Sequence, residues 1–217
     1  NPKHILKTPG IEEFLKMPQP SKNLVEKFKF DEVIKSTSKS KSNNNGYFEQ
    51  FKKELENKSS YMLMSAFVVY ATNSLLPDIS AQQIMNPNFE ALQLNQIICD
   101  IARSLRPDAA MLFLNAVVDM VRYPCRSTLF FMRTSLVILR TPAAKDGAIQ
   151  CDELLVRIIL ERASTHPPYP WGFKILVKMM LSDSQLSIFE KPYIKGSEAA
   201  TKFLKKIGEN FSNDKSV

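Results

Sequence analysis

The sequence predicts an all-α protein in which antiparallel helix pairs stack on one another, and three observations support this fold class. Nearly every apolar stripe after residue 46 repeats with the helical period. Strand-like alternation is nearly absent, since its one ambiguous stretch, 136–139, has helical flanks. Prolines recur between the stripes, which favours short turns between antiparallel helices. No strict sequence repeat is visible, so any solenoid is degenerate.

The chain has 217 residues, 44% of them hydrophobic, which is enough for one domain of ordinary size. Because it begins at Asn1 without an initiator methionine, we expect it to be part of a longer protein. Residues 1–46 are predicted to be a loosely ordered segment with two short helices, near 11–17 and near 24–34. The run at 36–46 has no apolar residue and cannot bury enough surface to offset chain entropy. We therefore predict a flexible loop there.

The helical domain is predicted to cover 47–211, followed by a flexible tail at 212–217. Its most apolar stretch, 59–77, has no charged residue and is nearly long enough to span a bilayer. However, the stretch contains several Ser, Thr and Asn residues. A central helix buried on most sides explains this composition better than a lipid-facing one. The sequence therefore predicts no membrane partner.

Six stripes with helical spacing predict helices in order along this domain. Their apolar members are Phe48, Phe51 and Leu55; Leu94, Ile97, Ile98, Ile101 and Leu105; Leu112, Phe113, Ala116, Val117, Met120 and Val121; Leu154, Leu155, Ile158 and Ile159; Phe173, Leu176, Val177, Met180 and Leu181; and Phe203, Leu204, Ile207 and Phe211.

The net charge of +7 is concentrated at the two ends of the chain. Residues 1–60 carry 12 lysines and 8 acids, and residues 191–217 carry 6 lysines and 3 acids. The middle is neutral, with 11 basic and 11 acidic residues, and it holds all eight arginines. Arginine is the residue that clamps phosphates and reads bases, so its absence from the basic ends favours solvated lysines over a nucleic-acid surface. A helical RNA-binding module that uses the lysine-rich ends stays open as the alternative function.

The residues that usually carry catalysis or metal binding do not form a recognisable constellation. The chain has two histidines and three widely spaced cysteines, which we expect to be reduced thiols in an intracellular protein. No nucleotide-binding loop or nucleophile elbow occurs. The acids are scattered, and we interpret Asp119, Asp152, Glu153 and Glu161 as helix-surface or cap residues, with Arg162 complementing a helix dipole. The sequence therefore predicts no enzyme, no metal and no cofactor, and a hydrolase with an unrecognised site is disfavoured.

Two proline-containing turns are the most distinctive local features. The first helix is predicted to end at Tyr123, because the residue before a proline is pushed out of the α region. Arg122 would then lie beside the free carbonyls of that helix end. In the second turn, at 167–172, we predict that Trp171 is mainly structural. Tyr169 lies between two prolines and is the better candidate for exposure.

These turns carry a resemblance to a known family. The motif Phe-Leu-Asn-Ala-Val occurs at 113–117 and is followed by Val-Arg-Tyr-Pro at 121–124. Ile-Leu-Glu-Arg at 159–162 is followed by Pro-Tyr-Pro-Trp-Gly at 168–172. At this spacing the chain resembles the C-terminal domain of the large Not scaffold subunit of the Ccr–Not deadenylase complex. The resemblance is strongest over 109–205.

The resemblance implies a non-catalytic, HEAT-like helical scaffold that supports mRNA deadenylation, mRNA decay, translational repression and transcription regulation in the cytoplasm and nucleus. The family's domain docks the Not-box subunits, whose extended N-terminal segments wrap around it, and some members also receive short peptides of translational repressors. The candidate partner-binding residues in this chain come from the two turns. They are Arg122, Tyr123, Pro168, Tyr169 and Trp171.

Overall fold

The computed structural model describes residues 19–38, 46–58, 60–141, 151–165 and 169–213. The predicted all-α fold is confirmed, because the described residues form helices and no strand. In chain order the elements are α3 (Lys22–Lys27), α4 (Phe30–Ser38), α5 (Gly46–Lys58), α6 (Tyr61–Leu75), α7 (Ala81–Met85), the 3-10 helix η1 (Pro87–Ala91), α8 (Gln93–Ser104), α9 (Pro107–Asp119), α10 (Arg126–Arg140), α11 (Cys151–Thr165), α12 (Trp171–Ser182), the 3-10 helix η2 (Ile188–Glu190), α13 (Pro192–Lys195) and α14 (Glu198–Asn213).

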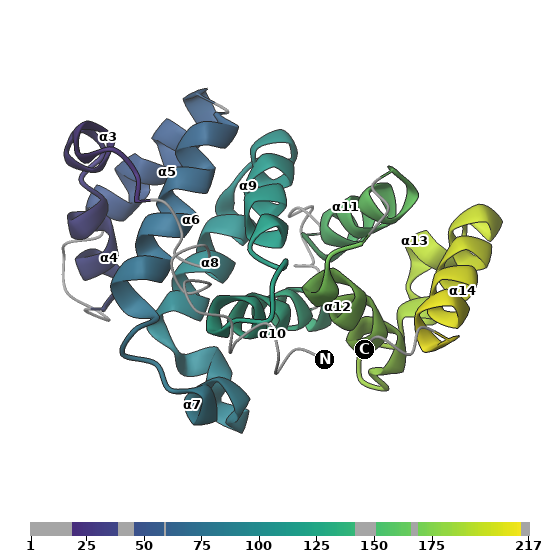
Figure 1. Ribbon diagram of the computed structural model, residues 1–217. Coiled ribbons are helices and arrows are strands. Elements are labelled where there is room, and N and C mark those ends of the chain that lie inside the picture. Colours follow the sequence, from purple (N-terminus) through teal and green to yellow (C-terminus); the bar gives the residue numbers. More distant parts are fainter. Residues whose placement is uncertain (1–18, 39–45, 59, 142–150, 166–168, 214–217) are drawn as a thin grey trace.

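The helices are stacked across the molecule in the order of the chain. In Figure 1, α3 to α5 lie at one end and α13 and α14 at the other. Helix α6 packs on α8 and α9, α9 packs on α11, α10 packs on α11 and α12, and α12 packs on α14. Each helix therefore buries its apolar face against helices near it in sequence, as expected of a helical array.

Helix α6 is the buried central helix that the uncharged stretch predicts. Its first turn is capped by the Ser60 side chain, which accepts a hydrogen bond from the Leu63 N–H at 3.4 Å. The Phe67 ring is fully buried, with its centroid 4.5 Å from that of Phe51 and 5.2 Å from that of Phe30. Within the described part of the chain, no helix is both long enough and apolar enough to cross a membrane.

The single helix predicted near 24–34 is wrong, because two helices occupy this segment. Helix α3 ends at Lys27, α4 begins at Phe30, and Lys29 between them has a positive φ of 50°. A continuous helix would place Phe28 and Phe30 about 200° apart around its axis, at about 100° per residue. The break lets Phe30 become fully buried, with its ring 6.4 Å from the ring of Phe28. The core therefore extends into the segment before residue 46.

The two described ends of the predicted loop at 36–46 are helical, contrary to expectation. Helix α4 continues through Ser38 and α5 begins at Gly46, while 39–45 lie outside the described residues. At the other end, α14 continues to Asn213, two residues into the predicted tail. The helix predicted near 11–17 also lies outside the described residues.

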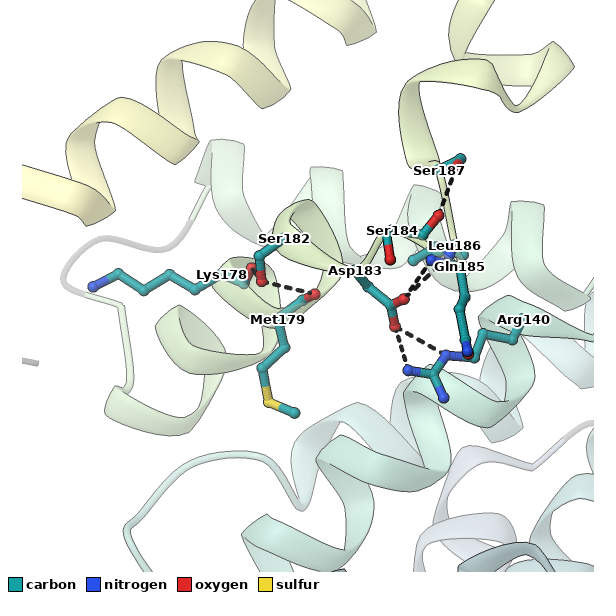
Figure 2. Close-up of polar contacts among 9 residues, drawn as sticks. All are labelled: Arg140, Lys178, Met179, Ser182, Asp183, Ser184, Gln185, Leu186 and Ser187. Atoms are coloured by element: carbon teal, nitrogen blue, oxygen red, sulfur yellow. Dashed lines mark hydrogen bonds and ion pairs between the residues drawn. The ribbon is translucent and has the colours of Figure 1, made fainter. Parts of the chain in front are cut away.

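Asp183 joins the C-terminal ends of α10 and α12 (Figure 2). Its carboxylate accepts hydrogen bonds from Nε and Nη2 of Arg140, at 2.9 and 2.5 Å, and from the N–H groups of Gln185 and Leu186, at 2.9 and 3.2 Å. Burial alone raises the pKa of Asp183, but the Arg140 guanidinium and the two backbone donors lower it below its usual value. The charged form is therefore the one that holds the two helix ends together.

Acid should weaken this junction. A carboxyl whose pKa is lowered by folding stabilises the protein above its unfolded-state pKa of about 3.9 and loses that contribution as the pH falls through the folded value. We expect the melting temperature of the parent to fall more steeply below about pH 5 than that of Asp183→Asn. At neutral pH the variant should be less stable by about 1 kcal/mol, because the Arg140 side chain is partly exposed. Melting curves measured across this pH range provide the test, and parallel curves would contradict it.

Candidate functional site

The two proline-containing turns meet at one place in the fold. The Gly172 N–H, in the first turn of α12, donates a hydrogen bond to the Arg122 carbonyl at 3.0 Å. A Cβ atom at position 172 would lie 2.5 Å from Cγ2 of Thr128 and 3.2 Å from the carbonyl carbon of Val121. Because real Cβ atoms do not approach other atoms so closely, glycine is required at this contact. The two segments therefore form a single surface.

Helix α9 does not end at Tyr123 as predicted, but at Asp119. After this residue the N–H groups of Met120 and Val121 bond to the carbonyls three residues earlier, at 3.2 and 3.0 Å, which tightens the last turn. The Thr128 hydroxyl of α10 then donates to the Met120 carbonyl at 3.1 Å. This contact from α10 thus helps to end α9 at Asp119, before the chain reaches Tyr123 and Pro124.

A groove of about 620 Å³ lies between the end of α9, the end of α11 and the start of α12. We call it the α9–α11–α12 groove. Its floor is apolar and almost inaccessible to solvent at Val118, Val121 and Phe173. Its lining among the described residues is Asn115, Val118, Asp119, Val121, Arg122, Glu161, Arg162, Thr165, Tyr169, Pro170 and Phe173.

The polar wall of the groove is organised around Asp119. Its Oδ1 accepts hydrogen bonds from Nη1 of Arg162 at 2.7 Å and from Nη2 of Arg122 at 3.3 Å, and its Oδ2 accepts one from the Tyr61 hydroxyl. Arg162 also donates from Nη2 to the carbonyl and side-chain oxygens of Asn115, at 3.1 and 3.0 Å. This network ties α6, α9 and α11 together.

The two acidic members of the network have shifted pKa values. Burial raises the pKa of Asp119. The hydrogen bonds from Tyr61 and Arg162 and the charges of Arg162 and Arg122 lower this pKa by more than burial raises it, so the net shift is downward. Burial and the adjacent Asp119 carboxylate raise the pKa of Tyr61 to about 12. At neutral pH the site therefore holds a carboxylate, a neutral phenol and two guanidinium groups.

Comparisons with known proteins identify the family of this chain. The family described as "CCR4-Not complex component, Not1" matches residues 2–208. The chain belongs to the Not1 family. It is 23% identical over 114 residues to general negative regulator of transcription subunit 1 of Schizosaccharomyces pombe, and 19% identical over 79 residues to the Saccharomyces cerevisiae protein of the same name. These matches cover 52% and 36% of this chain but only 5% and 4% of the two relatives.

A solved structure supports the same fold. The NOT1 superfamily homology domain from Chaetomium thermophilum matches 94% of this chain and 40% of its own chain, with a TM-score of 0.69 and 18% sequence identity. The two sequence motifs that carry the resemblance contact each other in this Not1-family chain. Asn115 of the first motif bonds Arg162 of the second, and the Arg122 carbonyl accepts from the Gly172 N–H.

The sequence places Asp152 and Arg162 correctly, in the first and last turns of α11, but the interpretation of Asp119, Asp152 and Arg162 as only surface, cap or dipole groups misses their partners on other helices. In this Not1-family chain, Asp119 and Arg162 form the ion pair between α9 and α11 described above, with each side chain only 25% exposed. Asp152 is buried and accepts from Nζ of Lys191 at 3.0 Å and from the Tyr193 hydroxyl at 3.1 Å. Among the described residues, no group of three or more His, Cys, Asp or Glu side chains could hold a metal ion.

The structure brings two of the five predicted site residues into the groove. Arg122 and Tyr169 line it, and Tyr123 lies next to Arg122 with 60% of its surface exposed. Trp171 is half-buried at the first position of α12, so its structural role stays a prediction. Pro168 lies outside the described residues.

The expectation that Tyr169 is a surface residue is wrong. Its side chain is half-buried, its ring centroid lies 6.0 Å from that of Phe173, and its hydroxyl donates to the Ala163 carbonyl. The last carbonyls of a helix have no partner within the helix, so a tyrosine that folds back over the end of α11 gains a hydrogen bond there. The Tyr169 side chain therefore lies against the end of α11 instead of projecting into solvent.

We expect Tyr169→Phe to lower the free energy of unfolding by about 1 kcal/mol, through loss of the hydrogen bond to Ala163. Tyr169→Ala should cost more, about 2–3 kcal/mol, because the ring contact with Phe173 is lost as well. Tyr123→Ala is the matched control, because Tyr123 is largely exposed and should change stability by less than about 0.5 kcal/mol. Thermal melts of the three variants provide the measurement. Equal melting temperatures for Tyr169→Ala and Tyr123→Ala would contradict this assignment.

Proposed function

We propose that this chain is a non-catalytic scaffold domain of the Ccr–Not complex that docks the Not-box subunits. In this role it supports mRNA deadenylation, mRNA decay, translational repression and transcription regulation, in the cytoplasm and nucleus. Membership of the Not1 family suggests the scaffold role. The observation that carries the docking proposal is the α9–α11–α12 groove, which opens where the two family motifs meet.

The surface around the groove suits a protein partner. Tyr123 is 60% exposed beside Arg122, and Met62 is 75% exposed next to Tyr61, the residue that bonds Asp119. Aromatic, Met and Arg side chains are enriched at protein interfaces. An extended segment lying on the helices would gain affinity from apolar anchors placed between them.

The test is direct binding to purified Not-box subunits from the same organism, measured by calorimetry at about 0.1 M and about 0.5 M salt. Docking by apolar anchors should survive the higher salt, whereas binding of RNA through lysines should weaken steeply over this range. The same protein should therefore be titrated with single-stranded RNA. Salt-sensitive RNA binding without any affinity for the Not-box subunits would overturn the proposal in favour of the RNA-binding alternative.

We also expect the purified chain to remove no adenosines from poly(A) in the presence of magnesium or zinc. Metal-dependent nucleases hold their ions with several converging carboxylates, and the acids here are engaged with arginine, lysine and tyrosine partners at the positions described above. Gel analysis of labelled poly(A) over time provides the measurement. Trimming that persisted through purification and was lost on replacing specific acids would contradict the non-catalytic assignment.

A further inference from the structure

Arg122 is the charged groove residue best placed to bind an external anion. Its side chain is 55% exposed, and its Nη2 lies 3.3 Å from Oδ1 of Asp119, the oxygen that Nη1 of Arg162 contacts at 2.7 Å. Arg162, in contrast, is 25% exposed and makes three hydrogen bonds to Asp119 and Asn115. A guanidinium carries five N–H donors, so Arg122 retains the capacity for a bidentate carboxylate.

Among the described residues, Arg122 is the groove cation that the neighbouring acids neutralise least. The charged lining residues are two arginines, at 122 and 162, and two acids, at 119 and 161, and Arg157 outside the lining pairs with Glu161. Three positive and two negative groups leave one positive charge in excess. Because Arg157 pairs with Glu161 and Arg162 with Asp119, the excess falls on Arg122.

The floor of the groove gives this cation an apolar neighbour. Val118, Val121 and Phe173 are buried and lie at the base of a volume of about 620 Å³. This volume lies in the range of ligand-binding clefts, roughly 300–1,000 Å³, and is large enough for at least one large side chain. The site therefore combines an apolar recess with a partly free guanidinium at its rim.

We propose that the α9–α11–α12 groove receives an extended segment of the docked subunit in which an apolar side chain fills the recess and an adjacent carboxylate pairs with Arg122. This inference rests on the proposed function, and it adds the position and the chemistry of the docked segment. Carboxylate recognition by arginine sets register and specificity, while the apolar side chain supplies most of the affinity.

The recess can be blocked with a closely matched control. Thr165 and Ser164 are adjacent exposed residues in the last turn of α11, and the hydroxyls of both donate to the Glu161 carbonyl, at 2.7 and 2.8 Å. Only Thr165 lines the groove. We expect Thr165→Trp to weaken binding of the Not-box subunit at least about 10-fold, and Ser164→Trp to stay within about 2-fold of the parent.

The charge can be tested by reversal and rescue. Arg122→Glu should weaken binding of the Not-box subunit at least about 10-fold, because the new carboxylate would face the carboxylate of the docked segment. Arg103→Glu, a reversal at an exposed residue of α8 outside the groove lining, should stay within about 2-fold. Arg122→Gln is the milder companion, because it adds no carboxylate beside Asp119. Replacing one acidic residue of the subunit's segment with lysine should restore binding to Arg122→Glu.

Binding is measured by calorimetry with the complete Not-box subunit, on variants whose melting temperature and helicity match the parent. If the parent binds and both Thr165→Trp and Arg122→Glu bind equally well, the groove is not the site, although the docking function stands. If Arg122→Glu is weakened but no acid-to-lysine change restores it, the carboxylate assignment is wrong. If the parent self-associates and only Thr165→Trp prevents this, the occupant is a second copy of the chain. No binding by the parent would overturn the proposed function and this inference together.

Discussion

Asp119→Ala is expected to lower the free energy of unfolding by about 2–3 kcal/mol. The substitution removes the acceptor for Arg162, Arg122 and Tyr61, and leaves Arg162, whose side chain is only 25% exposed, without its carboxylate. Breaking a fully buried ion pair costs about 3–5 kcal/mol, and partial exposure of this pair reduces the figure. For a chain of this size the melting temperature should fall by roughly 4–12 °C.

The matched control for Asp119→Ala is Glu161→Ala. Glu161 is 54% exposed and pairs with Arg157 one helical turn away, so its loss should cost less than about 0.5 kcal/mol. The double variant Asp119→Ala/Arg162→Ala should be more stable than the sum of the single effects predicts, because the second change removes the unpaired cation. Denaturant titrations of the parent, Asp119→Ala, Arg162→Ala and the double variant measure this coupling. Additive effects would show that the two side chains do not stabilise the fold through their ion pair.

Local periodicity was sufficient to predict most of the helices. The apolar stripes of α8, α11 and α12 each follow one face of their own helix, and most of their residues are buried, so the sequence alone identifies these helices. The uncharged stretch of α6 was likewise recognised as a buried helix. Segment ends were predicted less well, because contacts distant in sequence decide them. Thr128 helps to end α9, and the burial of Phe30 accompanies a break between α3 and α4.

The candidate site could be predicted in part. The two turns singled out in the sequence lie in contact, and Arg122 and Tyr169 line the groove, while their role in partner binding stays a prediction. The polar network was missed, because Arg162 lies 43 residues from Asp119 and Tyr61 lies 58 residues from it. Helical periodicity reports which face a residue occupies, but not which side chain it meets on another helix. Tyr169 was misplaced for the same reason, since its partner is the free carbonyl at the end of α11.

Gly172→Val is expected to destabilise the fold at least as much as Asp119→Ala, lowering the free energy of unfolding by about 3 kcal/mol. The first added carbon would lie 2.5 Å from Cγ2 of Thr128 and 3.2 and 3.3 Å from backbone atoms of Val121 and Arg122. Thr128 cannot move aside easily, because its side chain is buried and its hydroxyl bonds the Met120 carbonyl. Inserting methyl groups into such a packed contact costs about 1–3 kcal/mol, occasionally more. Since Gly172 anchors α12 to the turn that carries Arg122, the groove should widen as well.

Gly172→Ala separates the steric effect from helix propensity. Alanine gains up to about 1 kcal/mol over glycine in a helix, so the net loss should be smaller, about 1–2 kcal/mol. Gly46→Ala is the control, because no atom of the described residues lies within 4 Å of the Cβ added there, and it should change stability by less than about 0.5 kcal/mol. Thr128→Ser removes Cγ2 while keeping the hydroxyl, and combined with Gly172→Ala it should recover part of the loss. Denaturant titrations measure all of these effects. A Gly172→Ala protein as stable as the parent would show that α12 does not approach the 121–128 turn this closely.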